Sequence, residues 1–206
     1  MKTVFVNPER CLGCGQCQIA CAVEHSQSKD LVQAISEIPR PRSRIWVAPG
    51  STLNTSFPNK CRHCNPAPCM STCPTGAISR DIDCDVVFID GSRCIVCAMC
   101  AIVCPFDVIR YYPAASTPLY RTSALKCDNC LERQHRGDLP ACVEACKCHA
   151  LQFGDINELM RGAGARLAKT ILIALGPASK EVHQLPDNLE AWRGWGRSVI
   201  EIDEQS

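Results

Sequence analysis

The chain has 206 residues, a formal net charge of +1 and 5% aromatic residues, and 18 of its residues are cysteine. Because cysteine supplies much of the 46% hydrophobic content, the composition excludes a large conventional hydrophobic core. No basic stretch is interleaved with aromatic residues, which argues against nucleic-acid binding.

The first segment combines a short strand with a cysteine-rich loop. Residues 4–6 have the apolar character of a strand, and Cys11, Cys14, Cys17 and Cys21 follow with the spacing CxxCxxCxxxC. This spacing is typical of bacterial ferredoxins, in which three thiolates hold one iron–sulfur cluster and the fourth reaches a second cluster. We expect the fourth cysteine to begin a helix and to face away from its own loop.

About forty residues separate this first group from the next cysteines. Residues 30–38 have helical character, residues 43–47 have strand character, and residues 49–59 are rich in turn-forming residues. We interpret residues 31–56 as an insertion that covers a cluster.

Three further groups of four cysteines follow along the chain. The third group repeats the spacing of the first, and the second and fourth groups are wider variants of it. The cysteines predicted to bind metal are Cys11, Cys14, Cys17, Cys21, Cys61, Cys64, Cys69, Cys73, Cys94, Cys97, Cys100, Cys104, Cys127, Cys130, Cys142 and Cys146.

Two cysteines and one histidine near these groups have uncertain roles. Cys84 and Cys148 lie outside the spacing pattern. We interpret them as buried free thiols, although Cys148 is close enough to Cys146 to replace it as a ligand. His63 lies inside the second group, where it either donates a hydrogen bond to a cluster or lies at the surface.

Zinc sites and disulfide bonds are the alternatives to iron–sulfur clusters. Zinc sites usually pair two CxxC motifs that are a dozen or more residues apart, and only the fourth group resembles that arrangement. A disulfide scaffold requires an oxidising compartment, and residues 1–10 lack the apolar region of a secretion signal. We therefore expect four 4Fe-4S clusters in a cytoplasmic protein.

The chain contains an internal repeat. Residues 4–11 match residues 87–94, and the Lys-Cys pair at residues 60–61 matches the pair at residues 126–127. The order of the cysteine groups is therefore A, B, A′, B′, as expected for a duplicated two-cluster unit. The expected fold class is α+β, with short strands and cluster loops in two modules that each resemble a bacterial ferredoxin with two 4Fe-4S clusters.

A connector and a tail complete the chain. Residues 111–122 contain two prolines and are interpreted as an extended connector. Residues 157–175 have helical periodicity, and their apolar run is too short to cross a bilayer, so we expect no direct membrane insertion. Trp192 and Trp195 either anchor the tail on a partner or pack back on this chain.

The charge of the metal-loaded protein differs from that of the polypeptide. An oxidised 4Fe-4S centre with four thiolates carries about two negative charges, so four centres lower the net charge to about −7. A basic stretch at Arg40, Arg42 and Arg44 is notable against this background. It is either a contact for an acidic partner or a solvated loop.

Three sequence motifs resemble one known family. They are CRHCNPAPC at residues 61–69, CPTGAI at residues 73–78 and PACVEAC at residues 140–146. These motifs are similar to those of four-cluster ferredoxin subunits, which transfer electrons in dimethyl sulfoxide reductase, formate dehydrogenase and formate hydrogenlyase and with nickel carbon monoxide dehydrogenase. The resemblance covers residues 1–155 and implies an electron carrier without a catalytic site of its own.

The resemblance also implies which cysteines share a cluster. In this family the first group exchanges its last cysteine with the fourth group, and the second exchanges with the third. The implied sets are Cys11, Cys14, Cys17 and Cys146 for cluster one; Cys61, Cys64, Cys69 and Cys104 for cluster two; Cys94, Cys97, Cys100 and Cys73 for cluster three; and Cys127, Cys130, Cys142 and Cys21 for cluster four.

The same resemblance implies the domain organisation. Residues 1–30 and 120–155 together form the first ferredoxin-like module, and residues 57–112 form the second. The insertion at residues 31–56 lies between them in sequence. Residues 156–206 form a C-terminal helix and a tail that docks on a partner.

The metal ligands do not encode the partner. The opening motif NPERCLGC at residues 7–14 is most similar to the members associated with carbon monoxide dehydrogenase and hydrogenlyase. We therefore expect low-potential electrons to pass from a carbon monoxide dehydrogenase, or another catalytic oxidoreductase subunit, to a hydrogenase or a flavoprotein. Two alternatives stay open: the electron-transfer beta subunit of a molybdenum enzyme of the dimethyl sulfoxide reductase or formate dehydrogenase type, and a zinc-stabilised interaction module.

Overall fold

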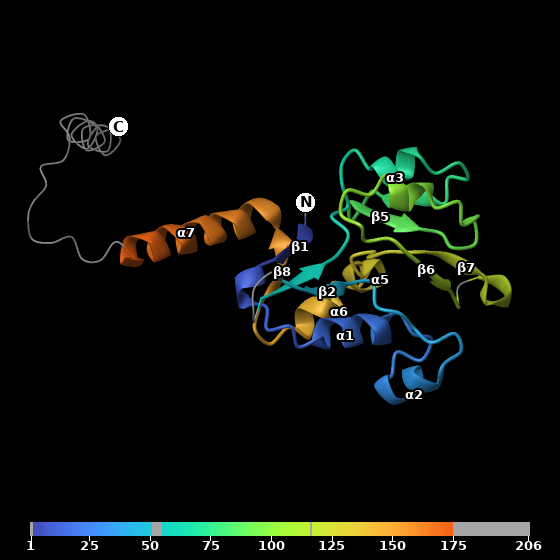
Figure 1. The fold of residues 1–206 in the computed structure, drawn as a ribbon, viewed down its shortest axis with the longest axis horizontal. Coiled ribbons are helices and arrows are strands. Elements are labelled where there is room, and N and C mark those ends of the chain that lie inside the picture. Colours follow the sequence, from blue (N-terminus) through green and yellow to red (C-terminus); the bar gives the residue numbers. More distant parts are fainter. Residues whose placement is uncertain (1, 51–54, 116, 175–206) are drawn as a thin grey trace, which may run out of the picture. The chain divides into compact units, whose positions relative to one another are not determined.

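The structure is a computed structural model that describes residues 2–50, 55–115 and 117–174. The chain divides into two compact units, Met1–Arg161 and Gly162–Ser206. The first unit contains all the cysteines and a mixture of short helices and strands (Figure 1), which confirms the expected mixed class. The boundaries of the two ferredoxin-like modules stay a prediction.

The described strands form four two-stranded antiparallel sheets. In the first sheet Val4 lies opposite Phe153, so this sheet joins the two ends of the cysteine-containing region. The pairs are β1 (Lys2–Val6) with β8 (Leu151–Asp155), β2 (Trp46–Pro49) with β3 (Ser56–Asn59), β4 (Ile78–Asp81) with β5 (Val86–Ile89), and β6 (Arg110–Pro113) with β7 (Thr122–Leu125).

Each cysteine group carries its third cysteine at the second residue of a short helix. These helices are α1 (Gln16–Glu24), α3 (Pro68–Ser71), α4 (Met99–Ile102) and α6 (Ala141–Glu144). The expectation that the fourth cysteine begins the helix is therefore wrong. Residues that favour a helix start lie just before the third cysteine: Gly15 and Ala98 have positive φ, Pro68 occupies the first helical position and Pro140 is the N-cap.

The remaining helices lie between and after these groups. Asp30 caps α2, because its side chain accepts hydrogen bonds from the backbone of Val32 and Gln33 at 3.0 and 2.9 Å. These helices are η1 (Pro8–Arg10), α2 (Leu31–Ser36), η2 (Pro118–Tyr120), α5 (Leu131–His135) and α7 (Ile156–Ala174). The helices expected over residues 30–38 and 157–175 are confirmed by α2 and α7, apart from residue 175, which lies outside the described part.

The second unit contributes only the later turns of α7 to the described residues. Across the described ranges, no helix is both long enough and apolar enough to pass through a bilayer. Trp192 and Trp195 lie outside the described residues.

Two segments differ from the sequence expectations. Residues 56–59, assigned to a turn, form strand β3, in which Pro58 is tolerated because the sheet has only two strands. Residues 111–122, assigned to an extended connector, form most of the β6–β7 hairpin. The Thr117 hydroxyl closes this hairpin, because Oγ1 lies 2.7 Å from the carbonyl oxygens of both Ala114 and Arg121 and its one proton is shared between these two acceptors.

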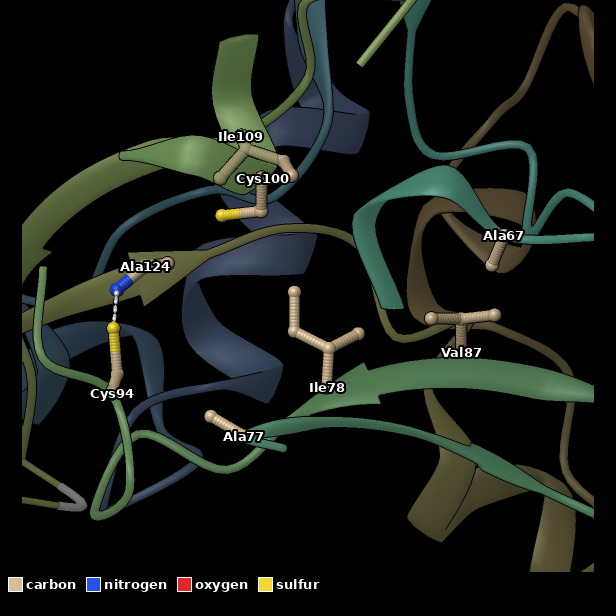
Figure 2. Packing of buried hydrophobic residues seen from close by; sticks show 8 residues of the cluster. All are labelled: Ala67, Ala77, Ile78, Val87, Cys94, Cys100, Ile109 and Ala124. Carbon is tan, nitrogen blue, oxygen red and sulfur yellow. Dashed lines mark hydrogen bonds between the residues drawn. The ribbon is translucent and has the colours of Figure 1, made fainter. Parts of the chain in front are cut away.

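The interior of the first unit consists of two small clusters of buried side chains. One contains Ala67, Ala77, Ile78, Val87, Cys94, Cys100, Ile109 and Ala124 (Figure 2). The other contains Val4, Cys17, Cys21, Ile45, Cys142 and Leu151. Cysteine side chains take part in both clusters, so the interior of this unit is built around sulfur atoms.

Candidate metal centres

Two cavities in the first unit are each lined by four cysteines from two different groups. The first has an empty volume of about 360 Å³, and its walls include Ala67 and Val87. The second has an empty volume of about 330 Å³ and is closed by side chains such as Ile78 and Ala124. We name them site two, with Cys61, Cys64, Cys69 and Cys104, and site three, with Cys73, Cys94, Cys97 and Cys100.

Four more thiols come together around Cys17, and we name this set site one. Burial, followed by the neighbouring thiols of Cys146, Cys11 and Cys14, raises the pKa of Cys17 to about 11. Three of these cysteines belong to the first group, and Cys146 belongs to the fourth. Because like charges repel, the four thiols resist ionising together unless a cation is present.

The last four predicted ligands come together around Cys142, and we name this set site four. Burial, followed by the neighbouring thiols of Cys127, Cys21 and Cys130, raises the pKa of Cys142 well above its ordinary value. Burial also raises the pKa of Cys130 to about 12, and Cys127 and Cys21 act in the same direction. All sixteen predicted cysteines thus fall into four sets of four.

The exchange of cysteines between groups follows from helical spacing. In every group the fourth cysteine comes four residues after the third, about one turn and roughly 6 Å further along a helix. Cys17 and Cys21 of α1 therefore belong to different sites, one and four. Helix α1 packs against α6, which carries Cys142 of site four and ends two residues before Cys146 of site one (Figure 1). Helices α3 and α4 pack in the same way between sites two and three.

Backbone N–H groups donate to cysteine sulfur atoms at sites two, three and four, and at site one a backbone hydrogen bond from Gln18 acts on the thiol of Cys17. Such hydrogen bonds stabilise thiolate ligands and raise the reduction potential of an iron–sulfur cluster. Figure 2 shows the one from Ala124 to Cys94. The donors and acceptors are Arg44 to Cys21 at 3.2 Å, Asn129 to Cys127 at 3.3 Å, His63 to Cys61 at 3.4 Å and Ala124 to Cys94 at 3.5 Å.

Two side-chain hydroxyls also lie beside sulfur atoms of site three. Tyr111 Oη is 3.3 Å from Cys100 Sγ, and Thr75 Oγ1 is 3.7 Å from Cys73 Sγ. The hydroxyl of Thr75 and nearby backbone N–H groups lower the pKa of Cys73, although burial acts in the opposite direction and is the largest single influence. These hydroxyls can donate to thiolate sulfur atoms, and such hydrogen bonds tune the potential of a bound cluster.

His63 presents a buried N–H group without a partner at site two. Burial, followed by the charges of Lys126 and Lys60, lowers the pKa of His63 to about 2, so the imidazole is neutral. Its Nδ1 accepts a hydrogen bond from the Val87 backbone at 3.1 Å, which leaves the proton on Nε2. Nε2 is buried and has no partner among the described residues. A cluster sulfur in this cavity would accept its hydrogen bond.

The alternative of a surface position for His63 is wrong, because its side chain is only 2% exposed. The reason is the β4–β5 hairpin, which brings Val87 over the second cysteine loop. A lone histidine in a sequence does not reveal such a contact.

A charged network beside site four was not predicted from the sequence. His25 Nδ1 lies 3.7 Å from Cys21 Sγ, and His25 Nε2 lies 3.0 Å from Asp128 Oδ1. Asp128 also forms an ion pair with Arg44. Burial acts to lower the pKa of His25, but the hydrogen bonds to Asp128 and Cys21 outweigh it and raise that pKa to about 10. Asp128 is 103 positions from His25 and 84 positions from Arg44, and no motif links them.

The basic stretch is not a free loop. Arg44 pairs with Asp128, and the guanidinium of Arg42 lies 4.9 Å from the centre of the Tyr112 ring. Arg40 lines an apolar groove against α2. Two of the three arginines therefore bind within this chain, which leaves little of the stretch for an acidic partner.

The two cysteines outside the pattern are half-buried rather than buried. Cys148 Sγ lies 3.7 Å from Cys146 Sγ, so it adjoins site one. Cys84 lies in the turn between β4 and β5, where its backbone N–H donates to Asp81 at 2.8 Å. The thiol of Cys84, a carboxylate oxygen of Asp81 and a ring nitrogen of His135 lie within 4.8 Å of one another.

The donor set of the four sites fits 4Fe-4S clusters. Each site offers four thiols, and hydrogen-bond donors reach sulfur atoms in all four sites. Four cysteine thiolates are the usual ligands of such a cluster. The iron of a bound cluster would also offset the repulsion between neighbouring thiolates, which otherwise favours the protonated thiols. The arrangement is that of a ferredoxin-type iron–sulfur protein.

Comparison with known proteins identifies the family. The model of the 4Fe-4S dicluster domain matches residues 53–156, about half of the chain. The chain belongs to this family of ferredoxin-type electron-transfer proteins, and its cofactors are four 4Fe-4S clusters.

Several characterised relatives match most of the chain. The electron transport protein HydN of Escherichia coli (strain K12) is 34% identical over 184 residues, which cover 84% of this chain and 98% of HydN. An iron-sulfur protein of Rhodospirillum rubrum is 38% identical over 160 residues, 75% of this chain and 82% of that protein. The thiosulfate reductase electron transfer subunit PhsB of Salmonella typhi is 37% identical over 169 residues, 77% of this chain and 79% of PhsB.

Proposed function

We propose that this chain is an electron relay in which sites one to four, with their sixteen cysteines, each hold one 4Fe-4S cluster. The observation that carries the proposal is the convergence of four thiols at each site, three from one cysteine group and one from a distant group. Each bound cluster supplies a one-electron redox couple. The polypeptide holds the clusters, sets their potentials and contributes no catalytic group of its own.

The helices set which sites are neighbours. One turn of α1 connects sites one and four, and α6 connects the same two sites. Helix α3 carries Cys69 of site two and is followed by Cys73 of site three, and α4 carries Cys100 of site three and is followed by Cys104 of site two. The relay therefore consists of two neighbouring pairs.

Sites two and four connect the two pairs. Burial lowers the pKa of Arg62, and the neighbouring thiols of Cys61 and Cys127 oppose this change. Arg62 thus lies close to a ligand of site two and to a ligand of site four. The resulting order is one, four, two, three, with sites one and three at the two ends.

The partner at the donor end follows from the sequence resemblance. The motif at residues 7–14 supports a relay that takes low-potential electrons from a carbon monoxide dehydrogenase in the cytoplasm and delivers them to a hydrogenase or a flavoprotein. A second candidate is the electron-transfer subunit of a molybdenum enzyme of the dimethyl sulfoxide reductase type. The 37% identity to the thiosulfate reductase subunit PhsB favours that candidate.

The relay is tested by metal analysis and electron paramagnetic resonance of anaerobically purified protein. We expect about sixteen iron atoms per chain and signals from reducible 4Fe-4S clusters after addition of dithionite. Stoichiometric zinc without iron would show a zinc-stabilised module instead.

The partner is tested by mixing the loaded protein with each candidate donor. A purified carbon monoxide dehydrogenase should reduce the loaded protein when carbon monoxide is supplied. The reduction is monitored as a decrease in visible absorbance. Reduction by a molybdenum enzyme with its own substrate, and not by carbon monoxide dehydrogenase, would support the second candidate.

A further inference from the structure

A basic residue precedes the first cysteine of every group, but its environment differs between groups. The residues are Arg10, Lys60, Arg93 and Lys126. The two arginines, beside sites one and three, are exposed. The two lysines, beside sites two and four, have exposed fractions of 0% and 3%. A fully buried lysine is rare unless it is paired with an anion.

The buried lysines contact backbone carbonyls. Lys60 Nζ donates to the carbonyl of Cys61 at 3.0 Å, and Lys126 Nζ donates to the carbonyl of Cys127 at 3.1 Å and to that of Val87. Neither lysine forms an ion pair with a carboxylate in residues 2–50, 55–115 and 117–174. Their positive charges are therefore not neutralised by a described side chain.

Each lysine acts on the site opposite to its own loop. Lys126 precedes a ligand of site four but lines the cavity of site two. Its charge opposes the burial that raises the pKa of Cys69, a ligand of site two. Lys60 precedes a ligand of site two, and its buried side chain lies near enough to Cys127, a ligand of site four, for its charge to act on that sulfur atom.

The residues around the lysines repeat between the two sites. His63 and Asn129 each follow the first cysteine of their group by two positions, have positive φ and are 2% exposed. The backbone N–H of each donates to that cysteine, at 3.4 Å for Cys61 and 3.3 Å for Cys127. Both halves of the contact between sites two and four therefore provide a buried cation and donors to sulfur.

We propose that Lys60 and Lys126 form a cationic bridge between sites two and four that makes the two inner clusters easier to reduce than the outer clusters. A cluster with four thiolates goes from about two to about three negative charges when it accepts one electron. A positive charge held nearby stabilises the reduced form more than the oxidised form.

The bridge gives the relay a defined resting place for electrons. An electron that enters at one end of the relay, at site one or site three, moves to an inner cluster. It then leaves through the site at the other end and reaches the acceptor protein. The inference rests on the proposed ligand sets. The exposed arginines make no comparable contribution at sites one and three, because water screens their charge.

The test uses Lys60→Met and Lys126→Met in the full chain loaded with clusters. The potentials of the clusters are measured by anaerobic redox titration with dithionite. Electron paramagnetic resonance monitors the reduced clusters at each potential. We expect the reduction equilibrium of the inner clusters to fall on the order of tenfold for each lysine, which is 59 mV for a one-electron couple. Arg93→Met is the matched control and should leave all potentials unchanged.

The outcomes separate the bridge from the relay itself. Unchanged potentials in lysine variants that retain about sixteen iron atoms would overturn the bridge and leave the relay intact. Absence of iron from the unmodified protein would overturn the relay. Lys60→Gln and Lys126→Gln retain a donor to the carbonyls and replace the methionine variants if those lose iron.

A second measurement needs no lysine variant. Cys64→Ser alters a ligand of site two, and Cys97→Ser alters the equivalent ligand of site three. In the otherwise unmodified chain, the signal that changes with Cys64→Ser should appear at a higher potential than the signal that changes with Cys97→Ser. The reverse result would show that an outer cluster is reduced first and would overturn the bridge.

Discussion

The Nε2–H group of His63 is a polar atom whose partner is not part of the polypeptide. The imidazole is held by the Val87 backbone and by the left-handed conformation of His63 itself, with φ of 51°. A buried donor without an acceptor costs about 1–3 kcal/mol, so its place at a thiol-lined cavity indicates a cluster sulfur as the acceptor.

Replacing this residue should lower one potential. In His63→Phe an aromatic ring remains, while the Nε2–H donor and the Nδ1 acceptor for the Val87 N–H are both lost, and a hydrogen bond to a charged group contributes about 1.5–3 kcal/mol. We expect the potential of the site two cluster to fall by roughly 60 mV or more in a redox titration. The exposed His135→Phe is the control. A potential that stays at the wild-type value would contradict a hydrogen bond from His63 to the cluster.

At the scale of the element, the one-turn step between third and fourth cysteines decides which ligands share a cluster. That step is present in the spacing of every group, so the four groups of candidate ligands could be identified from the sequence, whereas the helix starts at the third cysteine could not. Strands β1 and β5 were also predictable from their apolar residues.

Other features depend on contacts that no local pattern reveals. The β6–β7 hairpin was missed because its prolines suggested an extended connector, whereas the Thr117 hydroxyl closes it through two carbonyls. The burial of Lys60 and Lys126 was missed because lysine usually lies at the surface. Their environment arises only when cysteine loops distant in sequence come together.

The exchange of cysteines has a direct test. Cys21→Ala and Cys127→Ala belong to different groups but to the same proposed site, so each should remove or convert the same cluster. We expect both variants to lose the same paramagnetic signal, and Cys11→Ala to lose a different one. If Cys21→Ala and Cys11→Ala lost the same signal, each group would hold its own cluster and the proposed sets would be wrong.

At the scale of the whole molecule, sulfur atoms take the place of a conventional core. The two buried clusters of side chains are small, and cysteines belong to both. Arg133 on α5 adds ion pairs to Glu24 at 3.0 Å and to Glu144 at 2.5 Å, but such partly exposed pairs contribute only about 0.2–1 kcal/mol each. Metal ligation therefore provides most of what holds the four sites together.

Removal of iron should unfold the first unit. A chelator with an oxidant strips the clusters and leaves sixteen closely packed thiols without the cation that joins them. We expect the far-ultraviolet circular dichroism of the stripped chain to lose most of its native signal and to recover it on anaerobic reconstitution. A stripped sample that keeps the native spectrum would show that packing alone maintains the fold.

The pairing of β1 with β8 bears on how the protein forms during its synthesis. The cysteines of sites two and three all lie between residues 61 and 104, whereas those of sites one and four are divided between residues 11–21 and 127–146. As the ribosome extends the chain, the middle segment can take up iron first. The N-terminal loop must wait for the last strand to emerge, so a nascent chain stalled before residue 151 would carry half of its eventual metal.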